Sequence, residues 1–192
     1  MIGTAEVKSR AQEILKPLAE GFKSLGITPN LLTIAGFIFS MLSGFLICAN
    51  NLIGGAFFFA LSGLCDMLDG ILARTTNSTT KFGAFLDSFL DRYADFFPLS
   101  AIAFLAFKER DTLLLGFSLL SLMGSFATSY ARARAESLGA DCRTALLERP
   151  ERFLIILLSL LTGYLNFFMG VLAVFSNVTA VQRLVCAFKR LK

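Results

Sequence analysis

Histidine is absent from the 192 residues of this sequence, and only 17% of the residues are charged. Without imidazole, Ser–His and Cys–His nucleophilic chemistry is excluded, as are metal sites built on histidine. Soluble domains carry about 25% charged residues, so an ordinary cytosolic enzyme and a disordered tail are also excluded. The polar, amphipathic N-terminal stretch does not resemble a secretory signal peptide. Any catalysis must therefore use carboxylates, hydroxyls, lysine, arginine or a bound metal.

Cysteine is also scarce, and its spacing carries no known pattern. The four cysteines are Cys48, Cys65, Cys142 and Cys186, and they form no CxxC pair. We expect them to act as small apolar residues, because neither a disulfide framework nor a zinc site is indicated.

Long apolar runs are what the sequence has in place of charge. It is 55% hydrophobic, its mean hydropathy is +0.68, and residues 25–65, 112–131 and 153–182 contain no charged side chain. A membrane span needs about 20 apolar residues. We therefore predict an all-α integral membrane protein whose domain, residues 27–192, contains six transmembrane helices. The expected spans are 31–49, 53–74, 82–107, 112–134, 149–165 and 168–188.

The N-terminal residues 1–26 have a different pattern. Apolar side chains recur there at helical spacing with lysine and arginine between them, which is typical of an amphipathic helix lying in the membrane interface. A short soluble helix is the alternative. Pro29 suits the first turn of the helix that follows.

Basic residues are distributed unequally between the two ends of the expected spans. Two of them, Lys108 and Arg110, fall on one side. Fourteen fall on the other: Lys8, Arg10, Lys16, Lys23, Arg74, Lys81, Arg132, Arg134, Arg143, Arg149, Arg152, Lys189, Arg190 and Lys192. The positive-inside rule predicts that both termini face the cytoplasm. The net charge of +4 thus reflects orientation, and no nucleic acid partner is expected.

Aspartates lie within the second and third expected spans, where a charge costs at least ~2.5 kcal/mol without a partner. Asp66 and Asp69 share one helical face, and Asp87 and Asp91 share another. Because the connection 75–81 is short, the two helices are expected to be antiparallel neighbours with their carboxylates facing each other near the cytoplasmic end. Such an all-oxygen site suits Mg²⁺ or Mn²⁺.

Small residues and an arginine follow the same register. Gly70 and Ala73 leave room beside the aspartates, and Arg74 offers a fork for phosphate oxygens. Together with the carboxylates they predict a diphosphate site in a membrane. The alternative is that these small residues serve helix packing, the role we expect for Gly36, Gly44, Gly116 and Gly124.

Two structural alternatives concern the aspartates. Asp95 is not one of these four aspartates, and we expect it to pair with Arg92 three residues before it. Asp66 and Asp69 could themselves pair with Arg74 and Arg92 in an inert ion network.

Residues 66–91 resemble the signature of the CDP-alcohol phosphotransferase family, D-x2-D-G-x2-A-R-x8-G-x3-D-x3-D, at all eight fixed positions. The six-span layout with an N-terminal interfacial helix is also similar to that family. The resemblance implies metal-dependent transfer of a substituted phosphate group from a CDP-linked alcohol, expected to be a lipid, to an acceptor alcohol. CMP is released, and the product belongs to phospholipid biosynthesis. It also implies a homodimer.

The same resemblance implies roles for individual residues. Two divalent ions would be held by Asp66, Asp69, Asp87 and Asp91, and Asp91 would also deprotonate the acceptor hydroxyl. The CDP group would contact Asp66, Asp69, Gly70, Ala73, Arg74 and Gly83.

A second region indicates the acceptor. The run Ser-Tyr-Ala-Arg-Ala-Arg-Ala-Glu at 129–136 and the run Arg-Pro-Glu-Arg at 149–152 resemble the branch that transfers onto inositol phosphate. By this likeness the acceptor phosphate would be bound by Ser129, Arg132, Arg149, Arg152 and Arg190. Glycerol phosphate or another alcohol remains an alternative acceptor, and soluble CDP-inositol an alternative donor. Positive-inside topology alone can also place arginines here.

Other classes of membrane protein also carry intramembrane aspartates. An ion-coupled transporter is one alternative, although transporters place their sites near the midplane. A membrane prenyltransferase is larger, and a purely structural subunit does not explain four aspartates in register.

Overall fold

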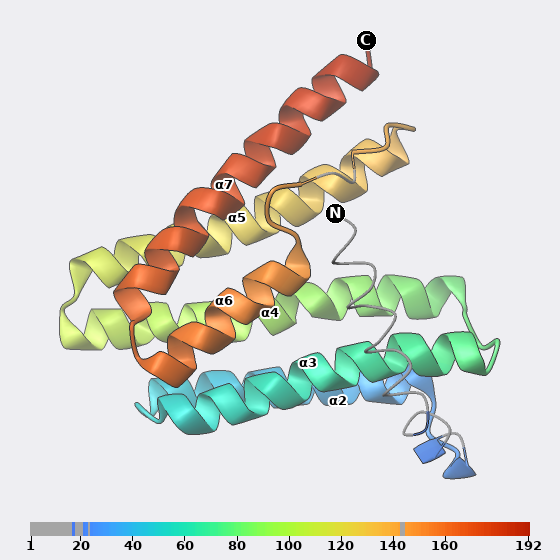
Figure 1. Cartoon of the computed structure of the whole chain (residues 1–192), viewed down its shortest axis with the longest axis horizontal. Coiled ribbons are helices and arrows are strands. Elements are labelled where there is room, and N and C mark those ends of the chain that lie inside the picture. Colours follow the sequence, from blue (N-terminus) through green and yellow to red (C-terminus); the bar gives the residue numbers. More distant parts are fainter. Residues whose placement is uncertain (1–16, 18–20, 23, 143–144) are drawn as a thin grey trace. The chain divides into compact units, whose positions relative to one another are not determined.

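The computed structural model describes residues 17, 21–22, 24–142 and 145–192, and this part of the chain is all-helical (Figure 1). Its helices are α2 (Pro29–Cys48), α3 (Leu52–Thr75), α4 (Lys81–Glu109), α5 (Thr112–Ser137), α6 (Arg149–Thr162) and α7 (Leu165–Arg190). All six predicted segments are helical, with bounds within three residues of those expected. The predicted interfacial helix at 1–26 lies almost entirely outside the described residues.

Local hydrogen bonds explain where several helices begin. The Thr28 hydroxyl accepts a hydrogen bond from the Leu31 N–H at 3.3 Å, just before Pro29 starts α2. The Asp111 carboxylate accepts from the Leu114 N–H at 2.9 Å and caps α5. Such side-chain caps satisfy backbone donors that have no partner within the helix.

In the part of the chain that the structure describes, four helices are long and apolar enough to cross a membrane: α2, α3, α5 and α7. The α6 helix has 14 residues, which span about 21 Å, less than a ~30 Å hydrocarbon core. The α4 helix is long enough, but Asp87, Asp91, Arg92 and Asp95 interrupt its apolar pattern. An integral membrane protein is therefore supported, while the count of six crossings stays a prediction.

The chain forms two compact units. Unit 1 contains the described residues up to Phe39 and Ala60–Ala94, and unit 2 contains Ser40–Phe59 and the described residues from Asp95 to Lys192. In unit 1, Leu32 of α2 packs with three leucine and isoleucine side chains of α3, at 68, 71 and 72. The close approach of these two helices depends on Gly36, where a Cβ atom would lie 3.2 Å from the Cys65 Cβ.

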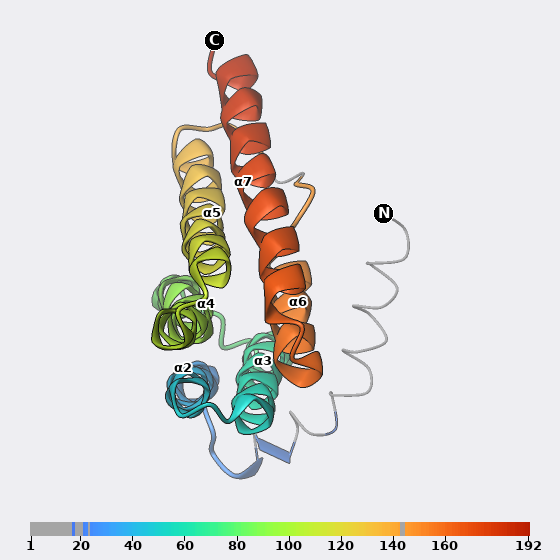
Figure 2. The same cartoon turned by 90° about the vertical axis from the view of Figure 1, so that its left-hand side faces the viewer.

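In unit 2, α5 and α7 lie side by side in both views (Figures 1 and 2). Their contact is made by small polar residues, as is usual between membrane helices: the Thr128 hydroxyl donates to the Ser176 carbonyl at 2.9 Å. A Cβ atom at Gly124 would collide with the Ser176 side chain. The packing role predicted for Gly36, Gly44 and Gly124 is thus confirmed.

For Gly116 the packing prediction is wrong. Among the described residues, no atom of another helix lies within 4 Å of the place a Cβ would take there.

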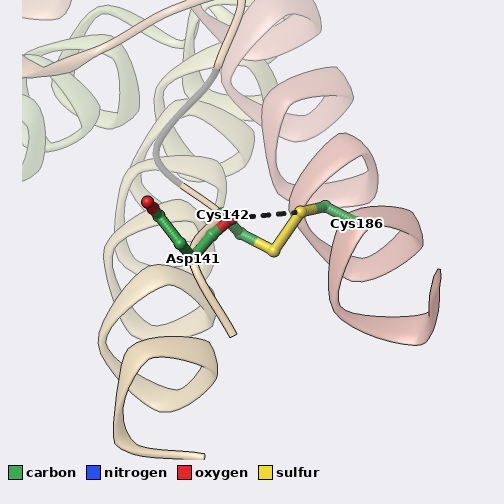
Figure 3. The surroundings of a disulfide bond; sticks show 3 residues. All are labelled: Asp141, Cys142 and Cys186. Carbon is green, nitrogen blue, oxygen red and sulfur yellow. Dashed lines mark hydrogen bonds between the residues drawn. A yellow bond between two sulfur atoms is a disulfide. The ribbon is translucent and has the colours of Figure 1, made fainter. Parts of the chain in front are cut away.

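Cys142 and Cys186 form a disulfide bond, so the expectation that no cysteine is paired is wrong (Figure 3). The two residues are 44 positions apart, and their Cα atoms are 5.9 Å apart, within the range that a disulfide requires. The reason is tertiary: the connection after α5 returns to the C-terminal half of α7, which no local spacing reveals. Cys48 and Cys65 are free and half-buried.

Candidate active site

Three carboxylates meet inside unit 1. Asp66 and Asp69 come from α3 and Asp87 comes from α4, and one carboxylate oxygen of each lies within 4.8 Å of the others. Their spacing explains this, because residues three apart share a helix face and the turn at 76–80 returns the chain alongside α3. Asp69 is the most enclosed of the three, with 6% of its surface exposed.

A hydroxyl from a third helix holds Asp69. Thr33 Oγ1 of α2 lies 2.7 Å from Asp69 Oδ2 and 3.1 Å from the Pro29 carbonyl oxygen. A hydroxyl has one proton to donate, and the shorter contact to a carboxylate is the stronger bond. Sequence reasoning missed Thr33, although a hydroxyl residue one turn into an apolar helix was a usable signal.

This donor set fits a hard divalent cation. It is built from carboxylate oxygens, which Mg²⁺ and Mn²⁺ prefer, and clustered negative charges at membrane depth require a counter-charge. An outer hydrogen bond such as that from Thr33 is what usually orients a metal-binding carboxylate.

Asp91, the fourth predicted metal ligand, lies on α4 one turn after Asp87 but outside this three-carboxylate cluster. Its Oδ2 atom is 3.8 Å from Arg92 Nη1, and its side chain is 14% exposed. The Arg92 guanidinium also donates to the Ser88 carbonyl.

The positions predicted to contact CDP differ in their surroundings. A Cβ atom at Gly70 would lie 3.4 Å from Arg74 Nη1, so the guanidinium of Arg74 lies over the glycine one turn earlier. At Gly83 a Cβ would come within 3.1 Å of Asn30 Oδ1, so this glycine allows α4 to approach the start of α2. Ala73 is half-buried beside Arg74.

The acceptor residues predicted from the sequence lie in unit 2, and one of them forms a buried ion pair. Arg152 Nη2 of α6 donates to Asp95 Oδ2 of α4 at 3.0 Å, with side-chain exposures of 3% and 9%. The expectation that Asp95 pairs with Arg92 is therefore wrong. Its partner lies 57 positions away, and burial of both charges requires a partner of opposite sign.

A further buried arginine was not predicted. Arg183 of α7 is 4% exposed, donates from Nη1 to the Thr128 carbonyl at 2.7 Å, and feels the charges of Arg132 and Arg152. The Nε atoms of Arg152 and Arg183 are buried without a hydrogen-bond partner among the described residues. A charge inside the apolar run of α7 was the available signal.

The other predicted acceptor residues are more accessible. Arg132 is exposed and pairs with Glu136, with 3.0 Å between Nε and Oε1. Ser129 and Arg149 are half-buried, and Arg190 is exposed at the end of α7.

Known proteins are similar to this chain in sequence and in structure. The sequence model of a family described as CDP-alcohol phosphatidyltransferase matches residues 26–182. An archaetidylinositol phosphate synthase from Pyrococcus horikoshii is 35% identical, over 98% of this chain and 98% of its own length.

Solved structures give the same result. The phosphatidylinositol phosphate synthase PgsA1 of Mycobacterium tuberculosis with CDP-DAG bound matches with a TM-score of 0.85 and 35% identity, covering 92% of this chain and 94% of that one. The same enzyme in complex with manganese and citrate matches with a TM-score of 0.84 and 34% identity, covering 90% of this chain and 88% of that one.

The manganese complex agrees with the divalent-cation site that the aspartates form here. The family match favours an enzyme over the transporter, the prenyltransferase and the structural subunit. The chain is a phosphotransferase of phospholipid synthesis and belongs to the CDP-alcohol phosphatidyltransferase family.

Proposed function

We propose that the enzyme transfers the phosphatidyl or archaetidyl group of a CDP-linked lipid to inositol phosphate and releases CMP. The names of the matched relatives support this choice: one is an archaetidylinositol phosphate synthase, and another is a phosphatidylinositol phosphate synthase whose structure holds CDP-DAG. The single observation in this chain that carries the acceptor assignment is the pair of buried arginines with unpartnered Nε atoms.

The donor half of the reaction belongs to the aspartate cluster. Asp66, Asp69, Asp87 and Asp91 would hold two divalent ions, Mg²⁺ or Mn²⁺, with Thr33 fixing Asp69. When bound, these ions neutralise the diphosphate and the leaving CMP. The guanidinium of Arg74 would bind phosphate oxygens, and Gly70, Ala73 and Gly83 would give the cytidine and ribose room to approach.

The transfer step then needs one base. The carboxylate of Asp91 accepts the proton of the acceptor hydroxyl. That oxygen attacks the lipid-bearing phosphorus, the bond from this phosphorus to the CMP oxygen breaks, and CMP leaves with the electron pair. Asp91 suits this role because it lies one turn from the cluster and on the same face of α4 as Asp87.

The acceptor phosphate would be bound in unit 2. Arg152 and Arg183 each present a buried N–H donor without a partner in the described part of the chain, and buried donors are nearly always paired in complete structures. A phosphate monoester supplies the charge and oxygen acceptors that guanidinium groups bind best. Ser129, Arg132, Arg149 and Arg190 would complete this acceptor site.

We further propose that residues 27–192 form one transmembrane catalytic domain whose termini and site face the cytoplasm, and that the enzyme is a homodimer. The basic residues at alternate helix ends support the orientation, and the family resemblance supports the dimer.

An acceptor panel tests the proposal. Purified protein with Mn²⁺ and CDP-diacylglycerol is given inositol phosphate, glycerol phosphate, inositol or serine, and CMP release is measured. We expect release with inositol phosphate, none for Asp91→Asn, and a raised KM for inositol phosphate in Arg183→Lys, because lysine keeps the charge but loses the fork. Arg134→Gln, an exposed arginine of α5, is the control. Preference for glycerol phosphate, for an unphosphorylated alcohol, or for CDP-inositol as donor contradicts the proposal.

A further inference from the structure

The described residues between α5 and α6 are attached to the C-terminal half of α7, which carries Arg183. We propose that residues 140–142 and 145–148 act as a strap that positions Arg152 and Arg183 for the acceptor phosphate. This inference rests on the proposed function, because it assigns the strap to the same acceptor site.

The first attachment is covalent. The Cys142–Cys186 disulfide joins the strap to α7 near its C-terminal end (Figure 3). Cys142 is fully buried and belongs to a small cluster with Ala135 and Ala140, against which Cys186 and Ala187 pack. The bond is therefore part of a packed contact and not an isolated link on the surface.

Two hydrogen bonds make the second attachment. The Leu146 N–H donates to Gln182 Oε1 at 3.1 Å, and the Leu147 N–H donates to Thr179 Oγ1 at 3.1 Å. The Thr179 hydroxyl gives its own proton to the Phe175 carbonyl at 2.7 Å, so its oxygen is left to accept. The Leu147 side chain is buried in the main hydrophobic core of unit 2.

The register of these attachments connects them to the acceptor site. Positions 179, 182 and 186 share one face of α7 with Arg183, since they follow the i, i+3, i+4, i+7 pattern. At its other end the strap runs directly into Glu148 and the first turn of α6, which carries Arg152. The strap thus binds the face that presents one arginine and leads into the helix that presents the other.

This arrangement has a specific consequence for binding. Releasing the strap should let the two guanidinium groups move apart and weaken acceptor binding, while the donor site in α2, α3 and α4 keeps its own contacts. On the proposed cytoplasmic face the disulfide faces a compartment that keeps thiols reduced in most organisms. The acceptor affinity should therefore depend on whether the Cys142–Cys186 bond is oxidised or reduced. Reduction by a dithiol supplies two electrons and two protons and converts the bond into two thiols.

Kinetics with matched cysteine variants test the strap. The variant Cys142→Ser/Cys186→Ser is compared with Cys48→Ser/Cys65→Ser, which changes only the free cysteines. We expect the first to raise the KM for inositol phosphate about tenfold, within the ~10²-fold that a 1 Å misplacement can cause. The KM for CDP-diacylglycerol should not change. Dithiothreitol should reproduce the effect in the wild type and in the control variant, and should have no effect on Cys142→Ser/Cys186→Ser.

The hydrogen bonds are tested in the same way. Thr179→Val should raise the acceptor KM, and Thr179→Ser, which keeps the accepting oxygen, should restore it. An unchanged acceptor KM, or an equal rise in donor and acceptor KM, overturns the strap because the second result indicates general loosening.

Hydrogen–deuterium exchange separates this inference from the proposed function. The amides of Leu146 and Leu147 should exchange faster in Cys142→Ser/Cys186→Ser than in the wild type, whatever the acceptor is. If they do not, the strap is refuted even when inositol phosphate is the acceptor. If the amides respond but inositol phosphate is no substrate, the proposed function fails, and with it the assignment of the strap to the acceptor phosphate.

Discussion

The hydrogen bond between Thr33 and Asp69 gives a prediction about metal affinity. Thr33→Val removes the hydroxyl and keeps the shape of the side chain, so the 2.7 Å contact to Asp69 Oδ2 is lost. A hydrogen bond to a charged group contributes about 1.5–3 kcal/mol, and loss of an outer-shell partner typically lowers metal affinity about 10- to 100-fold. We therefore expect the Kd for Mn²⁺ to rise by about one to two orders of magnitude.

The assay is Mn²⁺ binding measured by electron paramagnetic resonance, with the metal dependence of CMP release as a second readout. Thr33→Ser should restore both, because serine keeps the donating hydroxyl. Thr162→Val is the matched control: its hydroxyl donates to the carbonyl one turn earlier at 2.7 Å and accepts from the Tyr164 N–H at 3.4 Å, so this variant loses a helix hydroxyl that contacts no carboxylate. Wild-type Mn²⁺ affinity in Thr33→Val would refute the idea that this hydroxyl orients the cluster.

Three further predictions concern stability. Gly124→Ala should destabilise the protein by about 1–3 kcal/mol through overpacking, because its Cβ would collide with α7. Gly116→Ala, the control, should be neutral or stabilising. Equal shifts in Tm for the two variants would contradict the overpacking at Gly124. Hydrogen bonds from the Leu114 N–H and the Asn166 side-chain amide of α7 hold the pKa of Asp111 below its ordinary value. The Asp111 carboxylate therefore stabilises the fold above about pH 4 and loses this effect as the pH falls through its folded pKa. Asp111→Asn should make Tm fall less steeply with acidification, and an unchanged dependence of Tm on pH would contradict this prediction. Asp95→Asn should lower the free energy of unfolding by about 3–5 kcal/mol, because it leaves the buried Arg152 unpaired; denaturant unfolding measures this. A decrease below about 1 kcal/mol would mean that the ion pair is effectively solvated.

The helices and the aspartate cluster could be predicted from the sequence because they depend on local register. Runs of apolar residues set the helix bounds, and the spacing of Asp66, Asp69 and Asp87 placed their carboxylates on facing helices once the short turn between them was recognised. The 14-residue α6 was harder, because apolar character alone does not show where a helix stops; Gly163, with φ of 74°, ends it.

Contacts between distant segments could not be predicted. Asp95 and Arg92 are well spaced for a helical pair, yet Asp95 pairs with Arg152 because tertiary packing buries both groups together. Cys142 and Cys186 meet only after the connection following α5 folds onto α7. Arg183 stood alone in the sequence, and its significance comes from burial near Arg152.

The central claim is that the acceptor brings its own phosphate into the lipid product. The direct measurement is the transfer of ³²P from labelled inositol phosphate into solvent-extractable lipid, with Mn²⁺ and unlabelled CDP-diacylglycerol. The account predicts labelled lipid formed in step with CMP, and neither product with Asp91→Asn. Release of CMP from labelled inositol phosphate without label in the lipid, or release only when an unphosphorylated alcohol replaces inositol phosphate, would contradict it.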